Sequence, residues 1–183
     1  MFNRLISFLI LVLLLPVFLV VSFFILIEDG MPIFFMQKRV GVNYTFFSIC
    51  KFRSMKKDTP NVATHLLVHP EKYVLKIGRI LRKLSLDELP NLINILKGEM
   101  VFVGPRPALY NQDDLMQLRV EAGVDQLIPG LTGWAQVNGR DEISLEAKVS
   151  LEKEYLDRKS FWFDMKIIVL TFVRVLNSKG VKH

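Results

Sequence analysis

A run of uncharged residues near the N-terminus, from Leu5 to Ile27, constrains the fold more than any other feature of the sequence. As a straight helix, this run would be about 35 Å long, which is enough to cross a bilayer. One Arg precedes the run and no small-residue cleavage site follows it, so the segment is expected to stay attached rather than be removed as a signal peptide. Pro16, in the middle of the run, removes a helix hydrogen bond and permits a kink. The segment is therefore predicted either to span a membrane or to bend back to the side that it entered.

The composition also indicates contact with a membrane. Of the 183 residues, 51% are hydrophobic and the mean hydropathy is +0.31, which exceeds what a soluble core requires. The net charge of +6 is unevenly placed, since residues 31–85 hold eleven Lys and Arg against two acids, Asp58 and Glu71. A basic segment after an apolar one meets anionic headgroups or phosphate-bearing substrates on the cytoplasmic side more often than nucleic acid. Cys50, the single cysteine, excludes an internal disulfide and a multi-cysteine zinc site.

Two aromatic and β-branched stretches, 32–41 and 44–55, flank a turn and predict a pair of strands. Lys51 and Arg53 lie two residues apart, so in an extended chain they project from one face. One interpretation is a pair of phosphate contacts, and the other is a basic strand edge at the membrane surface. His65 and His69 have a spacing that suits metal ligands on a helix, but the absence of a third ligand nearby favours a loop.

A basic amphipathic helix is predicted over residues 71–84, where apolar positions recur at helical spacing. Its last turn brings Arg82 next to two adjacent acids, Asp87 and Glu88. Ser85 and Glu88 have the form of a capping box, so a helix is expected to begin near these residues and to end at Gly98. The positive end of that helix would favour ionised carboxylates, which suits a nucleophile or a metal ligand. The alternative is that both are ordinary acids of a first helical turn.

Two later segments hold further candidate binding residues. Arg106 lies between two prolines in Gly104-Pro105-Arg106-Pro107, and a guanidinium on a stiff loop is a good bidentate ligand for phosphate. A glycine-punctuated loop is predicted over residues 129–140, with four side chains in alternation that could meet a nucleobase or a sugar: Trp134, Gln136, Asn138 and Arg140. The alternative for Arg106 is a surface Arg in a Pro-rich turn, and the alternative for the glycine-punctuated loop is a plain turn with a core Trp.

The C-terminal third is predicted to be helical over residues 113–122, 143–159 and 161–176. The last of these contains Asp164, Lys166 and Arg174, so it is better interpreted as a helix that lies in the membrane interface than as a membrane span. The expected fold is an α-rich α+β membrane-associated domain with amphipathic interfacial helices and a small β element. Residues 1–29 form its N-terminal membrane helix or hairpin, and residues 30–183 form its cytoplasmic domain.

Five motifs in order give the chain a resemblance to a known family. They are Lys51-Phe52-Arg53-Ser54-Met55, Ser85-Leu86-Asp87-Glu88-Leu89-Pro90, Asn94-Ile95-Leu96-Lys97-Gly98, Gly104-Pro105-Arg106-Pro107, and Pro129-Gly130-Leu131-Thr132-Gly133 through Gly139-Arg140. Together they resemble the bacterial sugar transferase family, the small monotopic phosphoglycosyl transferases, over nearly the whole chain.

The resemblance implies an activity and a set of partners. The family transfers a sugar 1-phosphate from a UDP-sugar to undecaprenyl phosphate, releases UMP and begins a lipid-linked glycan such as a capsule. This places the protein at the cytoplasmic face of a bacterial cell membrane, upstream of further glycosyltransferases. The sequence does not indicate which sugar is used or what the oligomeric state is.

The resemblance also implies roles for individual residues. Asp87 would be the nucleophile that forms an acyl-phosphate with the sugar phosphate, and Glu88 would help to hold Mg²⁺. Lys51, Arg82 and Arg106 match basic positions that neutralise phosphate charge. Asp164 matches a family acid whose role the sequence does not indicate.

The chain departs from the family at one place. The family often has Ser-Pro at the break of its N-terminal membrane helix, which forms a re-entrant hairpin, whereas Leu15 precedes Pro16 in this chain. Pro16 still favours the hairpin over a full span. The extra transmembrane helices and the additional domain of larger members are not expected. Two rival hypotheses are a membrane-anchored scaffold that binds anionic lipid or an assembly partner, and an ordinary glycosyltransferase that releases UDP, although no D-x-D motif is visible.

Overall fold

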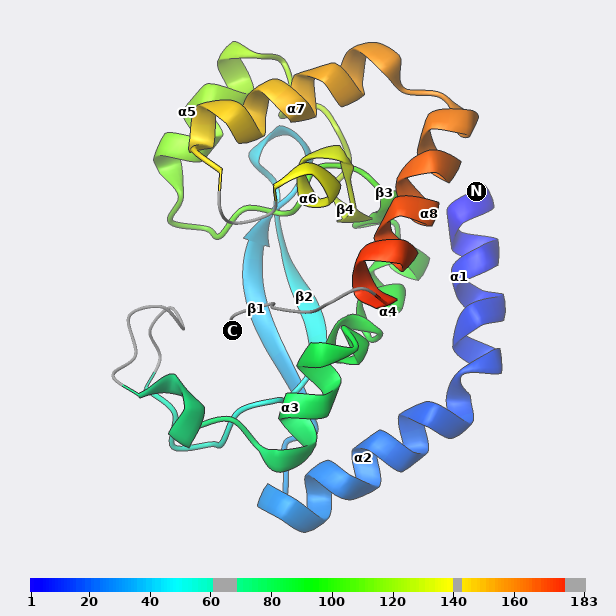
Figure 1. The fold of residues 1–183 in the computed structure, drawn as a ribbon, viewed down its shortest axis with the longest axis vertical. Coiled ribbons are helices and arrows are strands. Elements are labelled where there is room, and N and C mark those ends of the chain that lie inside the picture. Colours follow the sequence, from blue (N-terminus) through cyan, green and yellow to red (C-terminus); the bar gives the residue numbers. More distant parts are fainter. Residues whose placement is uncertain (61–68, 140–142, 177–183) are drawn as a thin grey trace.

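The uncharged N-terminal run folds into two helices. In the computed structural model, which describes residues 1–60, 69–139 and 143–176, α1 (Phe2–Leu13) and α2 (Leu15–Asp29) meet at a bend of 61° (Figure 1). Pro16 lies in the first turn of α2, where its missing N–H is not needed, so a new helix begins there. Within the described residues no single helix is long and apolar enough to cross a membrane, whereas the bent pair is when its two helices are taken together. The kink predicted at Pro16 is confirmed, and re-entry into a membrane stays a prediction.

One face of this helix pair packs against the rest of the chain. The Ser7 hydroxyl is fully buried and donates to the carbonyl of Leu92 at 2.6 Å, which fixes α1 beside α4 (Asn91–Lys97). Val21 and Ile25 of α2 lie in a core cluster with Phe52. The opposite face is exposed and apolar: Phe2, Leu5, Phe8, Leu9, Val12, Leu13, Leu15, Leu19, Val20, Phe23, Phe24, Leu26 and Ile27. Such a continuous apolar surface is typical of a membrane or protein contact.

The predicted strand pair is confirmed as an antiparallel hairpin of β1 (Phe34–Val40) and β2 (Phe46–Phe52), joined by the short helix η1 (Val42–Tyr44). It runs through the middle of the molecule in Figure 1. Ile49, Cys50 and Phe52 are buried, and the backbone N–H of Cys50 donates to the side chain of Asn94 in α4. The hairpin is therefore fixed to the helix that follows the two acids.

The end of α2 is fixed to the segment after the hairpin. Glu28 accepts hydrogen bonds from the first two backbone N–H groups of α3 (Lys76–Lys83), at 2.6 and 3.1 Å, and so caps that helix from another element. Asp29 pairs with Arg53 at 2.8 Å. These two contacts connect the N-terminal helices to the basic part of the chain.

The basic helix is shorter than its apolar spacing predicted. Residues 71–84 hold the short helix η3 (Pro70–Lys72) and then α3, with Leu75 in an extended conformation between them. The reason is pairing with the segment after β2, because Leu75 donates its N–H to the carbonyl of Ser54 and Val74 bridges Met55. Gly78 makes this close approach possible, since a Cβ there would lie 2.1 Å from the Ser54 oxygen.

The capping box predicted at Ser85 is wrong. Ser85 adopts a left-handed conformation with φ 55°, and its side chain caps no helix. Asp87 and Glu88 belong to the short helix η4 (Leu86–Glu88), and α4 starts only after Pro90. The turn that joins α3 to η4 uses Ser85 as its left-handed residue, and that conformation is not an N-cap geometry. The predicted end of the helix at Gly98 is confirmed.

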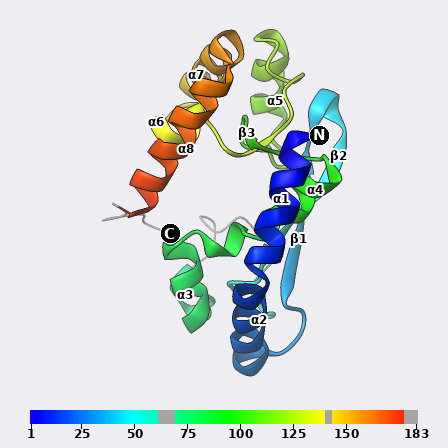
Figure 2. The ribbon, with the colours of Figure 1, turned by 90° about the vertical axis from the view of Figure 1, so that its right-hand side faces the viewer.

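The C-terminal half surrounds a short parallel pair, β3 (Val101–Val103) and β4 (Gly130–Thr132). The predicted helices are confirmed as α5 (Asp113–Glu121), α7 (Leu145–Arg158) and α8 (Phe161–Leu176). The predicted loop over residues 129–140 is wrong, because it holds β4 and the short helix α6 (Trp134–Asn138). Side chains of α7 and α8 close a core over β3, and these helices lie apart from α1 and α2 (Figure 2). One face of α8 is exposed and apolar: Phe161, Trp162, Val169, Phe172 and Val173.

Candidate active site

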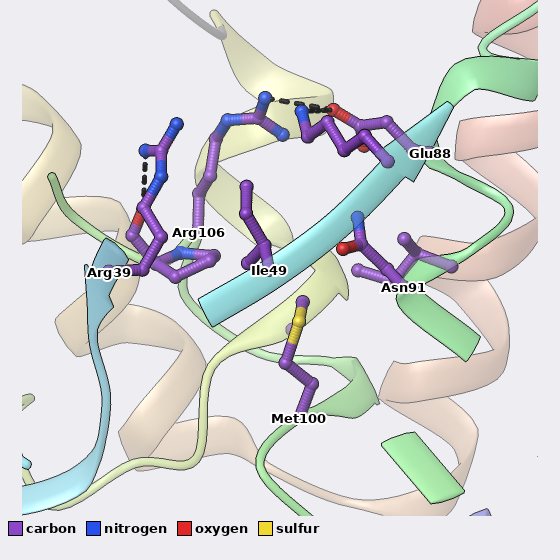
Figure 3. A pocket seen from close by; sticks show the side chains of 10 residues that line it. Arg39, Ile49, Glu88, Asn91, Met100 and Arg106 are labelled. Atoms are coloured by element: carbon purple, nitrogen blue, oxygen red, sulfur yellow. Dashed lines mark hydrogen bonds and ion pairs between the residues drawn. The ribbon is translucent and has the colours of Figure 1, made fainter. Parts of the chain in front are cut away.

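Glu88 is the centre of an ion cluster built from three parts of the chain. Its Oε1 accepts from Lys51 Nζ of β2 at 2.6 Å and from Arg106 Nη2, on the loop after β3, at 3.0 Å (Figure 3). Burial by itself would raise the pKa of Glu88, but the charges and hydrogen bonds of Arg106 and Lys51 outweigh it and hold that pKa well below its usual range. Glu88 is therefore a permanent carboxylate at neutral pH.

Asp87 has the opposite electrostatic environment. Burial and the neighbouring charge of Glu88 raise its pKa, and the charges of Lys51 and Arg82 oppose that rise only in part. Arg82 is oriented by its own hydrogen bond from Nε to the Ser54 hydroxyl at 2.9 Å. The expectation that a helix end stabilises both carboxylates as ions is wrong for Asp87. The two adjacent acids therefore have different proton affinities, which is typical of carboxylates with different chemical roles.

Arg39 of β1 is a site residue that sequence reasoning missed. Its Nη1 donates to the carbonyl of Pro107 at 3.0 Å, and its Nη2 donates to Gln37 at 2.6 Å. Burial, followed by the charge of Arg106, lowers the pKa of Arg39 to about 10, so the guanidinium stays charged at neutral pH. The sequence shows Arg39 only as one of many basic residues, because nothing local indicates which strand residue meets the Arg106 loop.

Arg39 lines a pocket beside Glu88. Figure 3 shows its wall, which is formed by Arg39, Ile49, Lys51, Glu88, Asn91, Met100, Arg106, Pro107, Gly130 and Leu131. Asn91 is 3% exposed, and within the described residues its Oδ1 has no hydrogen-bond partner. The pocket therefore offers three cations, one carboxylate and one amide to a polar ligand.

The loop that carries Arg106 is held at three of its carbonyl groups and at that of Val103, the last residue of β3. Those of Val103 and Pro105 accept from the Tyr155 hydroxyl at 3.1 Å and from the Gly130 N–H at 2.9 Å. The carbonyl of Arg106 itself accepts from Arg119 Nη2 at 2.9 Å, and that of Pro107 accepts from Arg39. The backbone of this loop is therefore fixed before any ligand binds, beyond the stiffness that its two prolines give it.

A buried ion pair supports the same loop. Arg119 of α5 and Glu152 of α7 are 5% and 2% exposed, and Arg119 Nε donates to Glu152 Oε2 at 2.8 Å while Nη2 contacts the other carboxylate oxygen. No local pattern predicts this pair, since Arg119 and Glu152 lie far apart in the chain. It fixes the distance between two helices and the loop that carries Arg106.

Comparison with known proteins identifies the family. Residues 1–178 match the family described as Bacterial sugar transferase. The chain belongs to the bacterial sugar transferase family.

Curated relatives of this sugar transferase have different lengths. It is 43% identical over 159 residues to "Uncharacterized sugar transferase EpsL" of Bacillus subtilis, which covers 86% of this chain and 76% of the relative. It is 40% identical over 185 residues to "Undecaprenyl-phosphate glucose phosphotransferase" of Komagataeibacter xylinus, and the match covers 95% of this chain and 35% of the relative. It is 36% identical over 179 residues to "UDP-glucose:undecaprenyl-phosphate glucose-1-phosphate transferase" of Escherichia coli, and the match covers 94% of this chain and 39% of the relative. The chain thus spans little more than a third of the last two relatives.

Several residues proposed from this sugar transferase's sequence lie apart from the cluster around Glu88. Arg53 is 6% exposed and is held by the carboxylate of Asp29 and by the carbonyls of Asp29 and Gly30, which is a structural contact rather than a phosphate site. Lys51 pairs with Glu88 and Arg53 pairs with Asp29, so the two side chains belong to separate ion pairs rather than to one pair of phosphate contacts. Arg140 lies outside the described residues.

Gln136 and Asn138 do not belong to an extended loop with alternating side chains, as predicted, because both lie in the helix α6. Gln136 donates to the carbonyl of Leu131 at 3.3 Å, and Asn138 donates to the carbonyl of Trp134 at 2.7 Å. Asp164 of α8 lies 2.8 Å from the Tyr155 hydroxyl, so it contacts the support of the Arg106 loop rather than the cluster itself.

Proposed function

We propose that this protein transfers a sugar 1-phosphate from a UDP-sugar to undecaprenyl phosphate and releases UMP. The observation that supports this most strongly is the pair Asp87 and Glu88, in which one carboxylate is held as an ion by two cations and its neighbour has a raised pKa. The relatives whose names specify undecaprenyl phosphate and UDP-glucose support the same class of reaction.

In the first step, Asp87 is the nucleophile. A carboxylate oxygen attacks the sugar-bearing phosphorus, an oxygen–phosphorus bond forms, and the bond from that phosphorus to the UMP oxygen breaks. The raised pKa of Asp87 makes its carboxylate more basic, which favours attack, and the charges of Lys51 and Arg82 beside it attract the anionic substrate.

In the second step, an oxygen of undecaprenyl phosphate attacks the same phosphorus. The bond to Asp87 breaks, its carboxylate is restored, and the lipid-linked sugar diphosphate leaves. Two substitutions at one carboxylate replace a direct transfer between two bulky anions. Lys51 and Arg106, held by Glu88, would offset the phosphate charge in both steps.

The residues present fit a magnesium ion that is held jointly with the substrate. Within the described residues no group of three or more His, Cys, Asp and Glu could hold a metal by itself. Mg²⁺ is commonly held by one or two carboxylates together with substrate phosphates, and Glu88 is kept ionised, as such a ligand must be. When bound, the ion would neutralise phosphate charge.

The apolar face of α1 and α2 supports a location at the bacterial cell membrane. The positive charge that follows these helices in sequence supports a catalytic domain on the cytoplasmic side, where UDP-sugars are made. A lipid-linked sugar diphosphate formed there would be the starting unit of a surface glycan such as a capsule, and further glycosyltransferases would extend it.

The test uses the full chain in lipid nanodiscs with UDP-glucose labelled in the sugar, undecaprenyl phosphate and Mg²⁺. The wild type should release UMP and, without the lipid acceptor, should take up a label that hydroxylamine removes. Asp87→Asn should do neither, whereas the matched control Asp113→Asn, at an exposed position of α5, should behave as the wild type. Substantial turnover by Asp87→Asn would falsify the nucleophile assignment. Release of UDP would indicate an ordinary glycosyltransferase, and no turnover with any of a panel of UDP-sugars would favour a scaffold.

A further inference from the structure

Charged groups of both signs meet around Glu88, and cations outnumber carboxylates where the pocket lies. Asp87 interacts with the charges of Arg82, Lys51 and Glu88, and Glu88 interacts with Lys51 and Arg106. Arg39 is a further cation there, and its guanidinium is repelled by the charge of Arg106 and attracted by that of Glu88. This part of the site therefore has an excess of positive charge, since the pocket wall holds three cations and one carboxylate.

Arg39 is held in place for a role at the pocket. Its bonds to Pro107 and Gln37 fix its orientation, and each uses only part of the donor capacity of a guanidinium, which has five N–H groups. Within the described residues its Nε is buried and has no hydrogen-bond partner. A partly buried cation that is repelled by another cation is costly, and an anion that binds to both would offset that cost.

The residues of the pocket wall indicate which anion would bind there. In phosphoryl transfer the attacking and leaving oxygens lie roughly in line with the phosphorus. Asp87, the proposed nucleophile, interacts with the charge of Arg82 and is not among the residues of the pocket wall, whereas Arg39 and Arg106 both belong to that wall. A leaving group that departs from Asp87 into this pocket would therefore meet the two guanidiniums.

We propose that Arg39 is a further substrate-binding residue, which together with Arg106 holds the phosphate of the departing UMP. This inference rests on the proposed function, because it needs a nucleotide that leaves opposite Asp87. Arg39 would bind the nucleotide phosphate of the UDP-sugar in the ground state and offset the charge that develops on it as the bond breaks.

The test compares inhibition by UMP with inhibition by uridine, which lacks the phosphate, in assays of the full chain in nanodiscs. Arg39→Met should weaken inhibition by UMP by about tenfold to a hundredfold, as expected for loss of a hydrogen bond between charged groups, and should leave inhibition by uridine unchanged. Arg39→Lys keeps the charge but not the fork of donors, so a smaller loss in the same direction is expected. Lys38→Gln is the matched control, because Lys38 is the exposed neighbour on the other face of β1, over the ring of Phe46.

The outcomes separate the inference from the function on which it rests. If the wild type releases UMP while Arg39→Met and Arg39→Lys are inhibited by UMP as strongly as Lys38→Gln, the inference is overturned and the function stands. Equal losses for UMP and uridine would show that Arg39 acts only by holding the loop, which also overturns it. If Arg39→Met does not fold, Arg39→Lys decides by the same comparison. A wild type that never releases UMP would overturn the proposed function first.

Discussion

Replacing Glu152 by Gln should destabilise the protein strongly, because it leaves the guanidinium of Arg119 buried without a counter-charge. Both residues are almost fully buried, and two donor atoms of Arg119 contact the carboxylate. Removing one partner of such a pair costs about 3–5 kcal/mol. For a domain of this size that corresponds to a fall in melting temperature of about 6–20 °C.

Thermal unfolding followed by circular dichroism, in the same nanodiscs for every variant, measures this loss. The matched control is Asp157→Asn, which breaks the exposed pair between Lys153 and Asp157 on the same helix, α7, and should cost less than about 1 kcal/mol. If Glu152→Gln melts within about 2 °C of that control, the fold does not need the charge of Glu152 to balance the buried Arg119, and the reasoning is refuted.

A double variant then separates stability from the position of the loop. Arg119→Met combined with Glu152→Leu removes both charges, and replacing a whole buried pair by apolar residues is often neutral or stabilising. Its melting temperature should recover toward the wild type, but the carbonyl of Arg106 would lose its donor. UMP release should therefore stay below the wild-type rate. Full activity in the stable double variant would show that this hydrogen bond does not position Arg106.

Asp87→Asn should melt at or above the wild-type temperature, because the fold raises the Asp87 pKa and the ionised form therefore opposes folding at neutral pH. A melting temperature clearly below that of the wild type, measured by calorimetry, would contradict this. The rate at which a UDP-sugar labels Asp87 should fall as the pH falls through this raised pKa, since only the carboxylate attacks. If rapid-quench measurements show the rate falling only at the ordinary pKa of Asp, burial and the Glu88 charge do not have the expected effect. Gly78→Ala should lose about 1–3 kcal/mol in urea unfolding, because its Cβ would meet the carbonyl of Ser54, whose hydroxyl orients Arg82; unchanged stability would show that α3 can move away freely.

The predictions that depend on local pattern agree with the structure. The uncharged run and Pro16 predicted a kinked apolar helix, and two aromatic and β-branched stretches on either side of a turn predicted the hairpin. The helices predicted over residues 113–122, 143–159 and 161–176 are present as α5, α7 and α8. These features follow from side-chain period and from the missing N–H of proline, which act within a few residues.

The predictions that disagree with the structure concern segments whose conformation depends on a distant partner. A capping box at Ser85 and a long basic helix were reasonable locally, but Ser85 turns the chain between two helices and Leu75 bonds to Ser54 instead. The segment 129–140 holds several glycines, yet β4 forms there because β3 lies beside it. Here tertiary hydrogen bonds outweigh local propensity, which is worth only fractions of a kcal/mol per residue.

The site shows the same division between sequence and structure. The sequence by itself determined that the chain has an apolar N-terminal segment, a basic region and two adjacent acids beside Arg82. It did not determine that Arg53 would be bound by Asp29 while Arg39, on the paired strand, would face Arg106. Nor did it determine that Asp87 and Glu88 would have opposite pKa shifts. The tertiary structure decided these points, because the burial of a charge and the sign of its neighbours depend on elements that meet only when the chain is folded.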